Sequence, residues 1–330
     1  MLYFKPKASH SGTVIITVLM LIAVATYLAV EMTYRQRIDI TRTGTLLALS
    51  QSEENVKSAE SLAQYVLTED LLSDIKETDS SDNLEESWTT PVQTTLGQGV
   101  IEGKIIDLQG RFNINRLLLG GDSREQFKTL LGNLSIPVDS SSNITPSIIS
   151  DRVFDWLDKN KNPELAGYEG QDYLLLDPPY TAANHILVDL SELMLIAGFT
   201  KDDLEKLAPH VALLPPMATL NINTATDETL KAYCLDSSKI ESTQSSGGYA
   251  KGDLTDLIDP KKGPVINGCD EVPVITEVGV KTDFFLLKAK ATIDKRTINM
   301  HSVLYRSGET APDVKVKVIL RKHLDPFSGV

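Results

Sequence analysis

An uncharged apolar run near the N-terminus constrains this chain more than any other feature. Thr13–Val30 (TVIITVLMLIAVATYLAV) contains eighteen residues and no charge. An α-helix rises about 1.5 Å per residue, so this run nearly spans the roughly 30 Å hydrocarbon core of a bilayer. Lys5 and Lys7 precede it without an acidic residue, which predicts a cytoplasmic N-terminus and an exported remainder. No small-residue cleavage site follows the run, so we expect an anchor and not an ordinary secretory signal.

The apolar run continues into an amphipathic segment, residues 31–72, which contains no proline and a single glycine, Gly44. Apolar residues recur at helical spacing on one face of this segment: Val56, Ala59, Ala63, Val66 and Leu67. The pattern predicts one helix of about 60 residues and about 90 Å. We expect its first third to lie in lipid and its last third to pack on a globular body.

The charge balance makes nucleic-acid binding a poor explanation of this chain. Its 330 residues include 32 Lys and Arg against 45 Asp and Glu, a net charge of −13. An acidic protein of this kind repels a phosphate backbone, so we expect no nucleic-acid partner.

Segments of alternating apolar and polar character predict a small antiparallel sheet. One strand is expected within Val100–Asn115, and three more follow at Asp283–Asp294, Thr297–Ser307 and Val314–Leu320. The predicted fold class is therefore α+β. A long N-terminal helix packs on the sheet, and a large, mostly helical insertion separates the first strand from the last three.

Within the insertion, short helices are predicted at Thr145–Leu157, Leu190–Ala197, Lys201–Leu207 and Glu228–Tyr233. Capping boxes are expected for the last two, from Thr200 with Asp203 and from Thr224 with Asp227. Three stretches without an apolar period are expected to be loops: Glu77–Ser87, Asp139–Ser142 and Ser237–Gly248.

A run of oxygen-bearing side chains follows the first of these helices. Asp158, Asn160 and Asn162 stand at positions 1, 3 and 5 of a calcium-type loop, and Glu169 stands at position 12. Position 6 is Pro163, where an EF-hand needs glycine. Hard oxygen ligands without His or Cys favour calcium over zinc. A solvated acidic turn is the alternative that the residues leave open.

Two further motifs and the histidines give little support to catalysis. The DPPY string within Leu176–Asn184 occurs in base-flipping methyltransferases, but no glycine-rich cofactor loop accompanies it, so a rigid loop is the better interpretation. Asn221–Ala225 (NINTA) resembles a helix-hairpin-helix unit, yet acidic Asp227 and Glu228 follow it and favour a packing role. None of the five His lies beside a Ser or Cys in a nucleophile motif, and we predict that the chain is not an enzyme.

The basic leader ending at Gly12, followed by the apolar helix, resembles the start of type IV pilins and pseudopilins. Thr17 replaces the glutamate that most members carry at mature position five. This departure resembles the K family of type II secretion minor pseudopilins, the general secretion pathway protein K family. Three internal motifs carry the same likeness: IDLQGRFNIN at Ile106–Asn115, LDPPYTAAN at Leu176–Asn184 and NINTA at Asn221–Ala225.

The resemblance implies a domain plan and a processing site. Prepilin peptidase would cut between Gly12 and Thr13, and Thr13 would be N-methylated. The implied parts are a cleaved leader (1–12), the membrane part of the helix (13–30), the rest of the helix and the first strand (31–111), an insertion of two subdomains (112–216 and 217–280), and the C-terminal strands (281–330).

The implied function is assembly. The family's K member is expected to cap and help nucleate the tip of the periplasmic pseudopilus, which drives export of folded proteins across the outer membrane. Implied partners are minor pseudopilins I and J, with H and the major pseudopilin, and the inner-membrane secretion platform. The chain would be a single-pass inner-membrane protein with a periplasmic body. A membrane-anchored periplasmic enzyme or binding protein, unrelated to pilus assembly, is the alternative.

The resemblance also favours calcium in the oxygen-rich loop, since the K family binds calcium. The expected ligands are Asp158, Asn160, Asn162, Glu169 and Asp172, with Asp155 as a supporting residue one helical turn earlier.

Cys234 and Cys269 are the only cysteines, and both lie in the part expected to be exported. An oxidising compartment favours a disulfide between them, with two free thiols or intermolecular pairs as alternatives.

Overall fold

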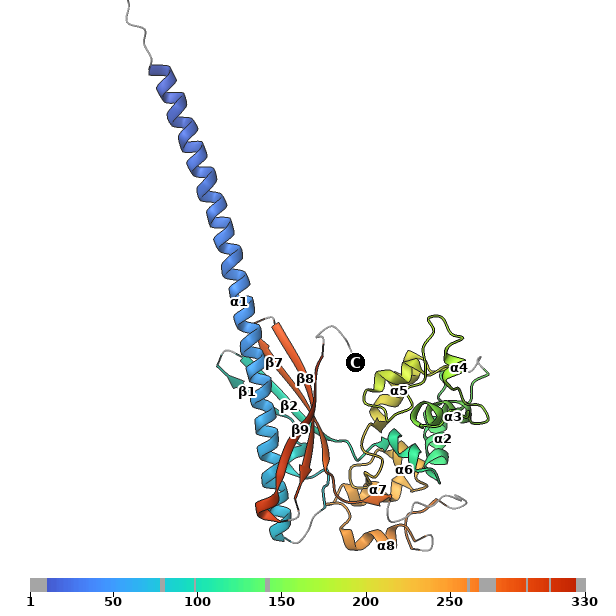
Figure 1. The fold of residues 1–330 in the computed structure, drawn as a ribbon. Helices are drawn as coiled ribbons and strands as arrows, with labels where there is room; N and C mark the ends of the chain where they lie inside the picture. The colour runs from blue at the N-terminus through green and yellow to red at the C-terminus, as the bar shows by residue number, and fades with distance from the viewer. Residues whose placement is uncertain are drawn as a thin grey trace, which may run out of the picture.

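The computed structural model describes residues 11–77, 81–97, 99–139, 143–259, 262–266, 277–294, 296–308 and 310–324. Its dominant element is one continuous helix, α1 (Ser11–Glu77), of 67 residues. The helix projects as a bare rod from a globular body (Figure 1). The prediction of a single long helix is confirmed, and within the described residues this is the one helix long and apolar enough to cross a membrane.

The lower part of α1 packs on the body, and its upper part does not. From Thr13 to Val30 every residue is exposed, whereas Val56, Leu67 and Leu71 are fully buried. Threonines along the exposed rod donate their hydroxyls to the carbonyl one turn earlier, which satisfies these groups inside the helix; examples are Thr26 to Ile22 and Thr33 to Ala29. The expected packing of the last third of the helix on a globular body is confirmed.

A five-stranded antiparallel sheet forms the body against which α1 packs. The strand order is β1-β2-β7-β8-β9. The strands are β1 (Val92–Leu96), β2 (Gly99–Asp107), β7 (Phe284–Ile293), β8 (Arg296–Ser307) and β9 (Lys315–Leu324). The four expected strands are present. The sequence analysis missed β1, because its residues are all exposed and show no apolar alternation.

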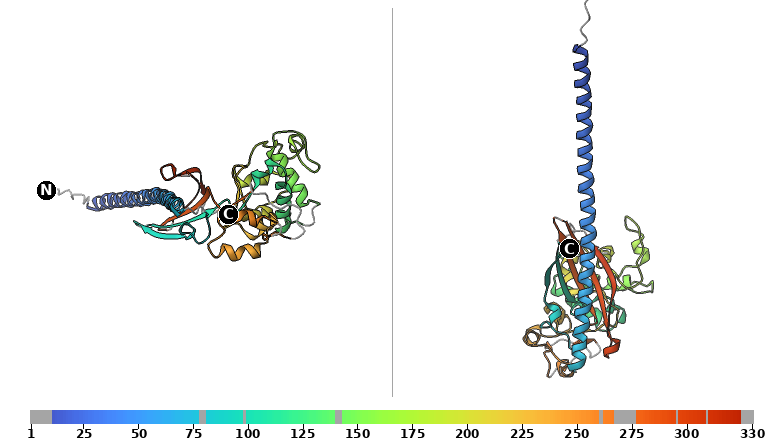
Figure 2. Two further views of the ribbon diagram at one scale, coloured as in Figure 1. Left: turned by 90° about the horizontal axis from the view of Figure 1, so that it is seen from below. Right: turned by 90° about the vertical axis from the view of Figure 1, so that its left-hand side faces the viewer.

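α1 covers one face of the sheet, and the insertion lies on the other side (Figures 1 and 2). The helix-facing core includes Val56, Leu67, Leu287 and Leu304. Trp88, from the short helix η1 (Ser87–Thr89), packs edge-on against Phe285 with ring centroids 5.2 Å apart. Alternate residues of β7 and β8 point into this core, as the period-2 pattern predicted.

The insertion between β2 and β7 is built from short elements around one core. These elements are β3 (Phe112–Asn113), η2 (Ile114–Leu119), α2 (Ser123–Asn133), α3 (Pro146–Leu157), α4 (Gly170–Tyr173), η3 (Leu190–Leu195), α5 (Lys201–Leu207), η4 (Ala208–His210), β4 (Val211–Ala212), β5 (Leu220–Asn221), α6 (Asp227–Ala232), α7 (Ser237–Gln244), η5 (Lys251–Asp253), α8 (Leu254–Leu257) and β6 (Val278–Gly279); η6 (Ala311–Asp313) lies outside the insertion, before β9. A single cluster of buried apolar side chains extends from Phe112 to Val280. The two expected subdomains therefore share a core.

Several local predictions are corrected. Ser237–Gly248 is not a loop throughout: α7 begins after the N-cap Asp236, and Ile240 and Gln244 are buried. The N-cap of α6 is Thr226 and not Thr224. The predicted helix at Leu190–Ala197 is the shorter 3-10 helix η3.

The two remaining predicted loops have different outcomes. Within Glu77–Ser87, Ser81 and Asp82 are buried, so this stretch is not a free surface loop. For Asp139–Ser142, residues 140–142 lie outside the described part.

The capping box that was expected between Thr200 and Asp203 is present at the start of α5. α3 begins one residue after its predicted start, since Thr145 is its N-cap.

Candidate functional site

The predicted processing junction lies at the beginning of α1. Thr13 is exposed, and residues 1–10 of the leader lie outside the described part. The Thr17 hydroxyl donates to the Val14 carbonyl at 2.9 Å. A carboxylate at this depth of a bilayer would need a partner, whereas this hydroxyl is satisfied by its own helix. The Thr17 side chain therefore needs no hydrogen-bond partner from another subunit.

The oxygen-rich loop begins where α3 ends. Asp158 is the C-cap of α3, and its carboxylate accepts from the backbone N of Asn160 at 3.0 Å and from its side-chain amide at 2.6 Å. The Asn160 side chain in turn accepts from the backbone N of Asn162 at 2.7 Å. These bonds fold the chain into successive tight turns that gather side-chain oxygens.

Glu169 and Asp172 cap the next helix. Asp172 accepts from the backbone N of Glu169 at 2.9 Å, and Glu169 accepts from the backbone N of Gly170 at 3.2 Å. Glu169 is buried, and its Oε1 has no hydrogen-bond partner. A buried carboxylate oxygen without a donor is costly, and this one is open to a cation. The residue types suit a hard metal ion, but among the described residues no three of the carboxylates at this loop bring their oxygens within 4.8 Å of one another.

Two further carboxylates, those of Asp155 and Glu164, lie beside this loop, and Asp155 was expected only in a supporting role. Asp155, in the last turn of α3, accepts from the backbone N of Glu164 at 3.1 Å. Burial, and after it the charges of Glu169, Asp158 and Glu164, raises the pKa of Asp155 to about 7. Burial also raises the pKa values of Asp158 and Glu169. The loop thus collects negative charge in excess, which a bound cation would relieve.

A second acidic cluster lies under the lower end of α1 and already holds a cation. The Arg306 guanidinium from β8 is fully buried and donates to Asp70 at 2.7 Å, to Asp82, and to the Thr282 carbonyl at 2.8 Å. Asp70, Asp82 and Glu86 bring carboxylate oxygens within 4.8 Å of one another. Nothing in the sequence pattern pointed to Arg306 and its partners, because they come from α1, from the segment before β1, from the segment before β7 and from β8.

The predicted packing motifs behave as structural elements. The Tyr180 hydroxyl of the DPPY string donates to the Leu195 carbonyl at 2.7 Å, and its ring packs edge-on near Trp156. Asn221 and Asn223 of NINTA are fully buried. The packing interpretation of NINTA is confirmed, and the DPPY string forms a loop, as expected.

Asn221 also joins the insertion to the sheet. Its side-chain amide donates to Asp107 at 2.9 Å and to the Asp82 carbonyl at 3.1 Å. Thr282 donates to the same Asp107 oxygen at 2.5 Å, and burial raises the pKa of Asp107 to about 6. This buried network fixes the insertion on the carboxyl end of β2.

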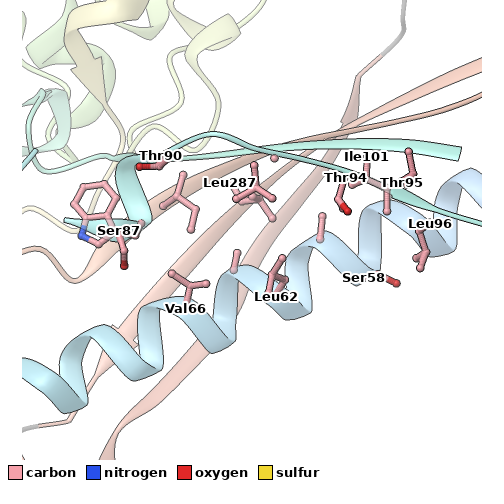
Figure 3. Close-up of a pocket in the computed structure, with 16 residues that line it drawn as sticks. Ser58, Leu62, Val66, Ser87, Thr90, Thr94, Thr95, Leu96, Ile101 and Leu287 are labelled. Carbon is pink, nitrogen blue, oxygen red and sulfur yellow. The ribbon is translucent and has the colours of Figure 1, made fainter. Parts of the chain in front are cut away.

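An apolar pocket of about 250 Å³ lies between α1 and the edge of the sheet. Leu62 and Val66 of α1 point toward Leu96, Ile101 and Leu287 across it (Figure 3). Its polar edge is formed by hydroxyl groups of Ser58, Ser87, Thr90, Thr94 and Thr95. The pocket carries no titratable group that would indicate chemistry.

A disulfide was predicted between Cys234 and Cys269. Cys234 is buried near the start of α7, and Cys269 lies outside the described residues. The pairing of these two cysteines remains a prediction.

Comparisons with known proteins agree with one another. A family model described as type II secretion system protein K matches residues 110–216. Type II secretion system protein K of Pseudomonas aeruginosa is 30% identical, over 96% of this chain and 93% of that protein. The protein of the same name from Pectobacterium carotovorum is 26% identical, over 96% of this chain and 97% of its own.

The fold is also known from a solved structure. A chain in the crystal structure of the GspK–GspI–GspJ complex from enterotoxigenic Escherichia coli matches 86% of this chain with a TM-score of 0.70, at 24% identity. It supports the α+β pilin-like architecture described above. Because the Pseudomonas relative is 30% identical along nearly the whole of both chains, this chain belongs to the type II secretion system protein K family and is a minor pseudopilin.

Proposed function

We propose that this minor pseudopilin caps the tip of the periplasmic pseudopilus and helps to nucleate it. The shape of the molecule supports this proposal most directly. The N-terminal part of α1 projects from the body as a bare rod, and the insertion lies beside the sheet at the opposite end of the molecule (Figure 2). The exposed apolar rod can pack among other pseudopilin helices below. The insertion would obstruct a further subunit above.

The proposed partners are minor pseudopilins I and J, with H and the major pseudopilin, and the inner-membrane secretion platform. The solved relative in a complex with GspI and GspJ supports the first two. Thr17 supports a tip position, because this helix satisfies its own hydroxyl and needs no partner from a preceding subunit. The competing role is a periplasmic enzyme or binding protein that only borrows an anchor, and the K-family relatives count against it.

We propose that the chain is a single-pass inner-membrane protein whose body lies in the periplasm, with the leader 1–12 removed by prepilin peptidase. N-terminal sequencing of the mature protein should begin at Thr13. We expect Gly12→Ala to block processing and so to abolish secretion. Gly44→Ala is the matched control on the same helix, since a Cβ there meets no atom within 4 Å. Normal cleavage of the Gly12→Ala chain would refute the leader assignment, and a mature protein beginning at Met1 would favour the borrowed anchor.

We propose that the loop following α3 binds calcium through Asp158, Asn160, Asn162, Glu169 and Asp172, with Asp155 among its charges. The unpartnered Oε1 of buried Glu169 supports this role. The ion would neutralise the excess carboxylate charge and hold the loop in place.

Calcium should therefore raise the melting temperature of the chelator-treated protein. A ligand present at about 100 times its dissociation constant adds about 2.7 kcal/mol to stability. Glu169→Gln should remove most of the calcium-dependent shift in differential scanning calorimetry. Asp202→Asn, at an exposed acidic position of α5, should leave the shift unchanged. A melting temperature that calcium does not move would rule out the site.

We also propose that Cys234 and Cys269 form a disulfide. Non-reducing mass analysis after alkylation should find no modified thiol.

A further inference from the structure

Basic side chains form a row across the sheet face that is turned away from α1. Lys104 of β2 stands opposite Lys288 of β7, Lys288 opposite His301 of β8, and His301 opposite Lys322 of β9. We call these four residues the basic row. Their strand neighbours, such as Ile105 and Leu287, point into the core under α1, so the row points the other way. Adjacent strands lie about 4.8 Å apart, which makes the row about 14 Å long.

The row costs the fold stability. Like charges directly opposite one another on a sheet are destabilising. Burial, and after it Arg111 and Lys104, lowers the pKa of Lys288. Burial, and after it Lys288 and Lys322, lowers the pKa of His301 to about 4, so this imidazole is neutral at pH 7. The charges of Lys104, Lys288 and Arg111 therefore repel one another across a short distance.

The carboxylate beside these lysines on the same face, that of Glu102, is bound by another residue. Among the described residues, neither Lys104 nor Lys288 forms an ion pair. Lys290, two residues along the same strand and on the same face, contrasts with them: it pairs with Glu102 at 3.2 Å. A chain with a net charge of −13 thus keeps uncompensated positive charge at one place. Uncompensated charge that lowers the stability of the fold is typical of a binding surface.

The surroundings of the row indicate what it binds. At one end Lys322 already holds a protein carboxylate, that of Asp189 from the insertion, at 2.7 Å. Leu320, 45% exposed, is paired with Val303 next to the row and offers apolar contact beside the charges. The charged residues of the row are lysines, whereas arginine forks are the usual choice for bidentate phosphate recognition. A protein surface that combines carboxylates with apolar groups fits these features best.

We propose that the basic row is a docking surface for a carboxylate-rich segment of a second protein. Acidic residues three and four apart on a helix lie about 5–6 Å from one another, which matches the spacing of the strands. The partner's carboxylates would lie against Lys104 and Lys288 and relieve their mutual repulsion. The surface belongs to the folded body, so the proposal holds whether or not the chain occupies the tip.

The test uses the full chain in a non-ionic detergent and a labelled oligo-glutamate peptide as the probe. The double variant Lys104→Gln/Lys288→Gln should bind the peptide about tenfold more weakly, and added salt should weaken binding to the native chain. Lys290→Gln is the matched control, since it removes one lysine from the same face, and it should change binding less than about twofold. The double variant should melt at the same temperature as the native chain or higher, because repulsion has been removed.

Four results would overturn the proposal. Equal losses in the double variant and in Lys290→Gln would show only general charge attraction. Unchanged binding in the double variant would place the peptide elsewhere. Tighter binding of tripolyphosphate or of phosphatidylglycerol vesicles, lost in the same double variant, would identify a phosphate site. A lower melting temperature in the double variant would make the lysines structural. Cleavage at Gly12, measured separately, distinguishes failure here from failure of the pseudopilin role.

Discussion

Replacing Arg306 with methionine should destabilise the protein by about 3–5 kcal/mol, because removing one partner from a buried ion pair leaves the other charge uncompensated. Arg306 and Asp82 are both fully buried, and Asp70 is nearly so. The guanidinium also lies 4.8 Å from the centre of the Phe285 ring. Methionine fills a similar volume but satisfies neither carboxylate, so Asp82 would have to be protonated or exposed on folding.

Urea unfolding followed by Trp88 fluorescence measures this effect, since Trp88 packs on Phe285 within the same core. Arg321→Met is the control: Arg321 binds the buried Glu60 at 2.7 Å, but the Arg321 side chain is 52% exposed and Ser302 also donates to Glu60 at 2.7 Å, so we expect a smaller loss. Arg306→Lys keeps the charge without the fork and should fall between the two. Equal losses from the methionine variants at 306 and 321 would contradict the prediction.

Stability should fall as the pH rises from 6.5 to 8, by about 1–2 kcal/mol, because the native state holds protons that the unfolded chain has already released. Burial, and after it the charges of Asp70 and Asp82, raises the pKa of Asp74 to about 7 and that of Glu86 to about 8. Both values exceed those of the unfolded chain, so native carboxylic acids lose their protons within this window. Both groups are partly exposed, and the figure is reduced accordingly for solvent screening.

Asp155, whose pKa is also raised to about 7, loses its proton in the same window and adds to the fall in stability. His301 does not contribute there. The pKa of His301 is lowered to about 4, so its cost to the native state appears only below the ordinary histidine value of 6.5. Thermal melts at several pH values, with calcium held constant, measure the slope.

Asp74→Asn should flatten that slope and stabilise the protein at pH 8, since the Asp74 Oδ2 is buried without a partner. Glu69→Gln, at an exposed position of the same helix, should leave the slope unchanged. Stability that is constant or rising between pH 6.5 and 8 would refute the mechanism.

The elements that the sequence predicted correctly are those with local periodicity. The helix pattern from Val56 to Leu67 and the alternation in β7 and β8 each repeat often enough to identify both the element and its buried face. β1 escaped prediction because an edge strand with every residue exposed carries no such signal. α7 escaped because a serine-rich composition resembles a loop until Ile240 and Gln244 are known to be buried.

The candidate sites divide in the same way. Asp158, Asn160 and Asn162 could be predicted because their spacing of two residues along the chain is itself the signal. Arg306 and Asp82 could not, since 224 residues separate them along the chain and no local pattern links them. Only the pairing of β8 with its neighbours brings Arg306 under α1, where the carboxylates of Asp70 and Asp82 bind it. Lys104 and Lys288 likewise become neighbours only through strand register.

The position of the insertion has a consequence for how the chain folds. β2 and β7 form an antiparallel pair, and the whole insertion connects them. The insertion leaves the sheet after Asp107 and returns to it before Phe285, which is the residue opposite Asp107. Closing so long a loop is slow even though its entropy grows only with the logarithm of its length. If the insertion condenses first around its own core, the bonds of Gln109 to Asn221 and to the backbone N of Asp283 bring the ends of β2 and β7 together. The folded insertion would then hold the ends of β2 and β7 close together, so that these two strands can pair in a late step of folding.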